Sequence, residues 1–195
     1  MNNRPFLFIL ALLGTLVGCD WTHKVPPPTQ EEIIHLIAAI PDHQFFEKTK
    51  DCYTDEYYRA LKKAWAVPSD GLGEIGSDEW LYYFITGNDD CNDFRIDNIS
   101  TVSHGRHATV QFVSTSCQTP STHAMELIYH KKAWVIADYD TTLAALKNYV
   151  VEQTKYFRQP QWQQKLDEAL ADPNWAEMAR ERQQEVEHFL SLQPR

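Results

Sequence analysis

The pattern of hydrophobic and polar positions predicts helices at both ends of the chain and strands between them. From residue 30 to residue 40, apolar side chains recur every three or four positions, which is the period of one helix face. Thr29 and Glu32 have the spacing of a capping box at the start of this helix, and Pro41 ends it. A first helix is therefore expected from about residue 30.

Two more helices are predicted before the strands. One has Thr54 as its N-cap and ends before Pro68. The other is short, is capped by Ser77 or Asp78, and stops at Gly87.

Between Asp93 and Asp140 the pattern changes to alternation of apolar and polar residues, which indicates half-buried strands. Four strands are predicted, at 93–102, 107–116, 122–131 and 133–139. Turns at Gly105, Pro120 and Lys131–Lys132 join them as an antiparallel meander. Since one face of such a sheet must be covered, we expect an α+β fold with N-terminal helices packed on a curved sheet of about four strands.

After Thr141 the helical period returns and continues to the end of the chain, which predicts a helical C-terminal extension. Pro160 and Pro173 divide this part, and Asp172–Pro173 has the form of an N-cap followed by proline at the first helical position.

The N-terminus has the features of a secretory signal. Residues 1–18 contain no acidic residue, one basic residue (Arg4), and an apolar run of about twelve residues. A helix that spans a membrane needs about twenty apolar residues, so cleavage is favoured over a permanent span. Leu16–Cys19 resembles the bacterial lipobox, whereas an ordinary secretory leader is the alternative.

The lipobox resemblance implies cleavage between Gly18 and Cys19 and acylation of the Cys19 thiol and amino group. Two or three acyl chains would hold the domain to a bilayer on the periplasmic side. Asp20 resembles the signal that retains lipoproteins in the inner membrane. The expected organisation is a signal peptide (1–18), a lipidated cysteine with a proline-rich tether (19–29), an α+β cone (30–150) and a helical extension (151–195).

Composition narrows the classes of partner. The 195 residues carry a formal charge of −9, so the net field repels nucleic acid and anionic lipid. A basic protein is the partner that this charge favours. No cofactor is expected, because the glycines of Gly71–Gly76 do not have the G-x-G-x-x-G spacing of a nucleotide-binding loop and do not follow a predicted strand.

With Cys19 acylated, three cysteines remain in an oxidising compartment. A hairpin that turns about Gly105 would bring Cys91 opposite Cys117, and we expect a disulfide there. A Cys52–Cys91 bridge is the alternative.

Neither a metal site nor a catalytic site is assigned from the sequence. His104 and His107 flank a turn with Arg106 between them, and His123 and His130 lie elsewhere in the predicted strands. The acidic residues from Asp89 to Asp97 lack the glycine and glutamate of a calcium loop. No G-x-S-x-G or H-E-x-x-H motif occurs. A triad assembled from distant residues stays open.

Three segments, at 53–61, 105–112 and 133–139, together resemble the YbjP-like lipoprotein domain family. This resemblance covers residues 30–150 and implies a cone like that of nuclear transport factor two or of cystatin. It implies no catalytic residues.

Two functions are consistent with these patterns. The favoured one is a non-catalytic module, anchored at the periplasmic face, that binds a protein or an envelope component, for example an immunity lipoprotein that neutralises a basic toxin. The alternative is a small hydrolase or ligand-binding domain that uses the pocket of the cone. Convergent ionisable groups would favour the second function, and an apolar, filled cone would exclude it.

Overall fold

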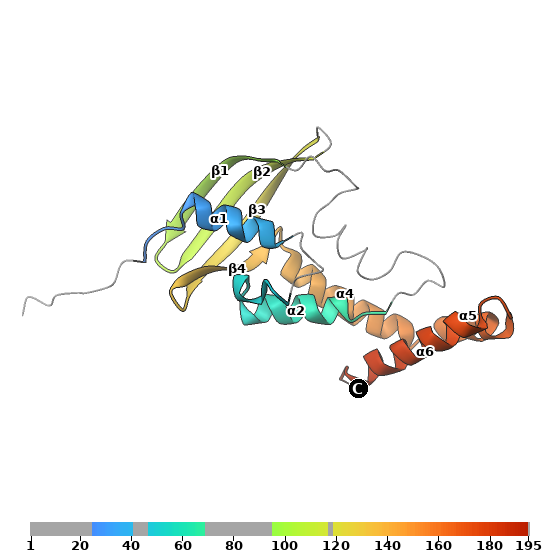
Figure 1. Cartoon of the computed structure of the whole chain (residues 1–195). Helices are drawn as coiled ribbons and strands as arrows, with labels where there is room; N and C mark the ends of the chain where they lie inside the picture. The colour runs from blue at the N-terminus through green and yellow to red at the C-terminus, as the bar shows by residue number, and fades with distance from the viewer. Residues whose placement is uncertain (1–24, 41–46, 69–94, 117–118, 195) are drawn as a thin grey trace, which may run out of the picture.

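A computed structural model describes residues 25–40, 47–68, 95–116 and 119–194 (Figure 1). The described elements are α1 (Gln30–Ala39), η2 (Lys50–Cys52), α2 (Asp55–Trp65), β1 (Arg95–His104), β2 (His107–Ser116), β3 (Thr119–His130), β4 (Ala133–Tyr139), α4 (Thr142–Phe157), α5 (Pro160–Ala171) and α6 (Ala176–Ser191). The strands form one antiparallel sheet in the order β1-β2-β3-β4, and the α+β prediction is confirmed.

Helix α1 lies across one face of the sheet and begins at the predicted capping box (Figure 1). The Glu32 backbone N–H donates to the Thr29 hydroxyl oxygen at 3.2 Å, and the Glu32 carboxylate accepts the Thr29 N–H at 2.8 Å. Ile33, Leu36 and Ile37 point into the core. The helix therefore starts where two otherwise unpaired backbone groups are satisfied and packs through its apolar stripe.

The strand register assigns alternate residues to the core. Val110 faces Met125 and Ala108 faces Leu127, and all four are buried. The same inward row continues along β2 to Ser114 and along β3 to His123. Near its start β1 is irregular at Asn98, which has a positive φ of 52°.

The β3–β4 turn has an unusual sequence for its shape. Lys131 and Lys132 both have positive φ, 48° and 71°, which is the conformation of a two-residue type I′ turn. Asn–Gly is the preferred sequence there, and a residue with a Cβ in this region costs about 1 kcal/mol. Local conformational preference therefore does not explain the two lysines.

The edge strand β4 is covered by the segment that leads into α2. Tyr53 forms an isolated parallel bridge with Ile136, and the Thr54 N–H donates to the Ile136 carbonyl at 2.8 Å. Thr54 then caps α2, as predicted, by accepting the Tyr57 N–H. Helix α2 packs against α4, and this pair lies at one end of the sheet (Figure 1).

The C-terminal helices differ from the prediction at one restart. Asp172 and Pro173 do not begin the last helix: Asp172 is the C-cap of α5, and α6 starts at Ala176. The Asp172 carboxylate instead accepts the Asn174 N–H at 2.9 Å, which forms a local turn. An aspartate can satisfy a turn as well as a helix start, so this signal did not define the boundary.

The core continues from the sheet into the extension. Helix α4 runs through position 150 without a break, although the expected domain division lies there. Beyond it, Phe157 packs edge-to-face against Trp162 and Phe189, and all three are buried.

Several expectations fall on residues outside the described ranges. They are the leader with Gly18, Cys19 and Asp20, the short helix after Ser77, and the Cys91–Cys117 pair. Cys52 is described; it is buried and free. Within the described residues, no helix is long and apolar enough to cross a bilayer.

Candidate functional site

A chain of polar side chains lies where the inward rows of β2 and β3 end, next to the start of α4. His123 is its central member. Its Nε2 lies 2.8 Å from the Ser114 hydroxyl, and its Nδ1 lies 2.6 Å from the Asp140 carboxylate. Ser114 comes from β2, His123 from β3 and Asp140 from the residue after β4, so three adjacent segments build the site.

Strand pairing sets the spacing of these groups. His123 is opposite Phe112, two residues before Ser114, so serine and histidine are diagonal neighbours on the same sheet face. Asp140 is held at the edge of β3 by its backbone and its side chain. Its N–H donates to the Ala124 carbonyl at 2.8 Å, and its carboxylate accepts the Ala124 N–H at 2.6 Å.

Aromatic rings fix the imidazole plane. The His123 ring stacks on the Tyr139 ring, with centroids 5.5 Å apart. It also contacts the Phe112 ring, with centroids 5.1 Å apart. The side chain of His123 is 11% exposed and that of Asp140 is 32% exposed, whereas Ser114 as a residue is 5% exposed. The carboxylate thus has the greatest access to solvent and the serine the least.

The Tyr139 phenol adds a second polar contact to this centre. Its oxygen lies 2.8 Å from Nδ1 of His123. Burial, and then the charge of Asp140, raise the pKa of Tyr139 well above its ordinary value, so the phenol stays protonated as a donor. Nδ1 of His123 thus has two partners within hydrogen-bond distance, the Tyr139 hydroxyl and the Asp140 carboxylate.

This arrangement defines the chemistry available to Ser114. A carboxylate beside Nδ1 favours the imidazole tautomer that carries its proton there. Nε2 is then left with a lone pair that can accept the Ser114 hydroxyl proton. Nucleophile, base and orienting carboxylate in this order are the parts of an acyl-transfer site.

In the sequence, His123 is only one of several dispersed histidines, and no motif marks Ser114 or Asp140. The available signal was alternation: Ser114 follows Ala108, Val110 and Phe112 on the inward row, and His123 precedes Met125 on its own row. Polar residues at inward positions of two neighbouring strands mark a candidate site on the inward face of the sheet.

The other candidates that lie within the described residues do not assemble into a site. His104 and His107 are exposed and face each other in the register beside the β1–β2 turn. Among the described residues no group of three or more histidine, cysteine, aspartate or glutamate side chains is arranged to hold a metal ion. Cys52 lies 3.7 Å from the His35 Nε2, and burial raises its pKa, which makes the thiol less nucleophilic.

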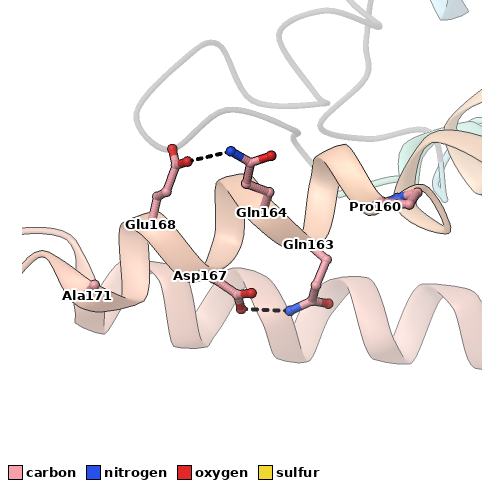
Figure 2. Close-up of a pocket in the computed structure, with 6 residues that line it drawn as sticks. All are labelled: Pro160, Gln163, Gln164, Asp167, Glu168 and Ala171. Carbon is pink, nitrogen blue, oxygen red and sulfur yellow. Dashed lines mark hydrogen bonds between the residues drawn. The ribbon is translucent and has the colours of Figure 1, made fainter.

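Figure 2 shows a surface hollow along α5 that is separate from the polar chain. It is lined by Pro160, Gln163, Gln164, Asp167, Glu168 and Ala171. The two glutamines donate to the two acids one turn later, each at 2.9 Å. These are ordinary side-chain pairs of an exposed helix face and bring no reactive group into the hollow.

Comparison of the chain with protein-family models, with curated proteins and with solved structures gives no match.

Proposed function

We propose that this protein is a lipoprotein anchored through acylated Cys19 at the periplasmic face of a bacterial membrane, and that its domain is a small serine hydrolase. The hydrogen-bonded chain Ser114–His123–Asp140 is the observation that supports the hydrolase, with its distances of 2.8 Å and 2.6 Å. Asp20 next to the anchor favours the inner membrane. The resemblance to the YbjP-like family agrees with the anchor and leaves the activity open.

The proposed reaction follows from the positions of the protons. As the Ser114 oxygen attacks the carbonyl carbon of an ester, its proton moves to Nε2 of His123, and Asp140 stabilises the imidazolium that forms. The imidazolium then protonates the leaving alcohol, and the acyl group remains on Ser114. Water deprotonated by Nε2 releases the acid and restores the serine hydroxyl.

A second candidate is the non-catalytic module that binds a basic protein. The low exposure of Ser114, 5%, favours it, because a hydroxyl enclosed in a satisfied network can serve packing alone. The two candidates differ in one property, the reactivity of Ser114.

Labelling with a fluorophosphonate probe tests that property in the purified full protein. We expect covalent labelling at Ser114, and hydrolysis of p-nitrophenyl acetate that is lost in Ser114→Ala. Ser121→Ala is the matched control, because Ser121 is opposite Ser114 in the register, is exposed, and should leave labelling unchanged. Asp140→Asn should lower the hydrolysis rate by about 10³ to 10⁴-fold through the wrong imidazole tautomer.

An unlabelled wild-type protein with an intact circular-dichroism spectrum would exclude the hydrolase and favour the binding module. Labelling that persists in Ser114→Ala would exclude Ser114 as the nucleophile.

The anchor is tested independently by mass spectrometry of the protein from membranes. We expect the chain to start at Cys19 with added acyl mass, and the Cys19→Ala variant to carry none. A mature chain that starts elsewhere without acyl mass would contradict the anchor and leave the hydrolase question untouched.

A further inference from the structure

Exposed cations gather at one end of the sheet. Arg106 lies in the β1–β2 turn, and Lys131 and Lys132 form the β3–β4 turn; all three are exposed. The Arg106 guanidinium donates twice to the Tyr129 carbonyl, at 3.0 Å and 2.8 Å, so it joins the first turn to the strand that leads into the second. Three exposed histidines flank these turns: His104, His107 and His130. We call this region the basic end.

The tether reaches the fold at the basic end. The Trp134 indole N–H donates to the Pro26 carbonyl at 3.1 Å, and Trp134 is the second residue after the β3–β4 turn. Figure 1 shows the N-terminal segment that precedes α1 beside the turns that join β1 to β2 and β3 to β4. The chain that arrives from Cys19 is therefore attached to the domain where these cations lie.

The charge of this end is opposite to that of the whole protein, which is −9. Asp97 and Asp140 lie at or beyond the far ends of their strands, away from the two turns. Glu31 and Glu32, in the first turn of α1, are the acidic residues that follow the tether most closely. The Glu32 carboxylate is engaged by the Thr29 N–H and hydroxyl.

The lysines occupy positions where another sequence would fold more easily. Both have positive φ, where asparagine and glycine are preferred. A choice that contradicts local preference and leaves two charges exposed indicates that the charges themselves are used.

We propose that the basic end binds the anionic phospholipid headgroups of the membrane that holds the anchor. This inference rests on the proposed acylation of Cys19. A negative surface attracts clustered lysine and arginine side chains and repels the acidic remainder of the domain, so it orients the domain as well as binding it. Ser114 and the α5–α6 hairpin then face away from the bilayer.

Paramagnetic relaxation in nanodiscs measures this orientation directly. The acylated full protein is placed in discs that contain a gadolinium-chelating lipid, with either phosphatidylcholine alone or a mixture with phosphatidylglycerol. In the mixed discs we expect the amide signals of residues 104–107 and 130–133 to broaden much more than those of α6. The difference should fall in phosphatidylcholine discs and as salt is raised.

The variant Lys131→Asn/Lys132→Gly removes two charges while supplying the sequence that the turn prefers, so the fold is retained. We expect this variant to lower the affinity of the basic end for the mixed discs by about 25-fold, since each lysine near an anionic surface raises the affinity by about five-fold. Lys63→Gln/Arg180→Gln is the control; it removes the same charge from exposed positions in α2 and α6 and should leave the broadening unchanged.

Equal broadening in both kinds of disc would overturn the inference for an acylated protein, and so would broadening that survives in Lys131→Asn/Lys132→Gly. If Cys19 carries no acyl group, the anchor proposal fails on its own. The unacylated chain added to the same discs then still supports the inference if binding requires phosphatidylglycerol and both lysines, and contradicts it otherwise.

Discussion

Tyr57 illustrates how one residue couples stability to pH. It is 2% exposed, its hydroxyl lies 2.5 Å from that of Thr142, and burial raises its pKa well above the ordinary value. The unfolded phenol loses its proton at about pH 10, whereas the native phenol keeps it. The contribution of Tyr57 to the free energy of unfolding should therefore be fully present below about pH 10. It should decline as pH rises further, because the unfolded state then binds fewer protons than the native state.

The variant Tyr57→Phe separates two effects of the Tyr57 hydroxyl on stability, its hydrogen bond to Thr142 and its ionisation at high pH. At neutral pH we expect a loss of about 1–2 kcal/mol in the free energy of unfolding, because the buried Thr142 hydroxyl loses its partner. Above about pH 10 the variant should lose stability less steeply than the wild type. Urea unfolding across this range measures both, and parallel pH curves for the two proteins would contradict the assignment.

Residue identity alone predicted little of the candidate site. His123 was noticed as a histidine, but its partners were not, because a serine or an aspartate in isolation has the same chemistry at any exposed position. Ser114 and Ser121 are opposite each other in the register and share one face of the sheet, yet Ser114 is 5% exposed beside His123 whereas Ser121 is exposed. The reactivity of a single side chain therefore depends on neighbours that are distant in the sequence.

At the scale of elements, helix starts are the best-determined features. The capping box of α1 was predicted from Thr29 and Glu32 because both partners lie within four residues of each other. Thr29→Ala should lower the free energy of unfolding by about 1 kcal/mol, and Thr29→Ser should restore most of it. Equal stability of the alanine variant and the wild type in urea unfolding would show that the box is dispensable.

Helix α4 connects the sheet to the C-terminal extension. Substitutions on its buried face should therefore lower the free energy of unfolding more than substitutions on its exposed face. Leu146 is 0% exposed, and Leu146→Ala should cost about 2–5 kcal/mol of unfolding free energy by leaving a cavity. Val151 is 50% exposed on the same helix, and Val151→Ala should change the free energy by less than about 0.5 kcal/mol. Similar values for the two variants would mean that α4 does not carry the core.

For the whole molecule, the far part of the α5–α6 hairpin is expected to be the least stable described region. Leu166, Ala169 and Ala179 form a small cluster separate from the main core, which extends only as far as Trp162, Val186 and Phe189. Native-state hydrogen exchange should therefore be faster over residues 166–179 than over α4. Exchange that is uniform across both regions would indicate one cooperative unit.

The sequence by itself determined the class of fold, most of the elements and two of their turns, because capping boxes, alternation and prolines act over a few residues; the turn predicted at Pro120 was wrong, since Pro120 pairs with Thr115 inside β3. It also predicts a lipid anchor, since the lipobox is a short contiguous signal. Only the tertiary structure decided that Ser114, His123 and Asp140 meet, and that the tether and two basic turns share one end of the sheet. The physical reason is the same for both: neighbours across strands are set by register and by which face the helices cover, and no local interaction along the chain specifies these.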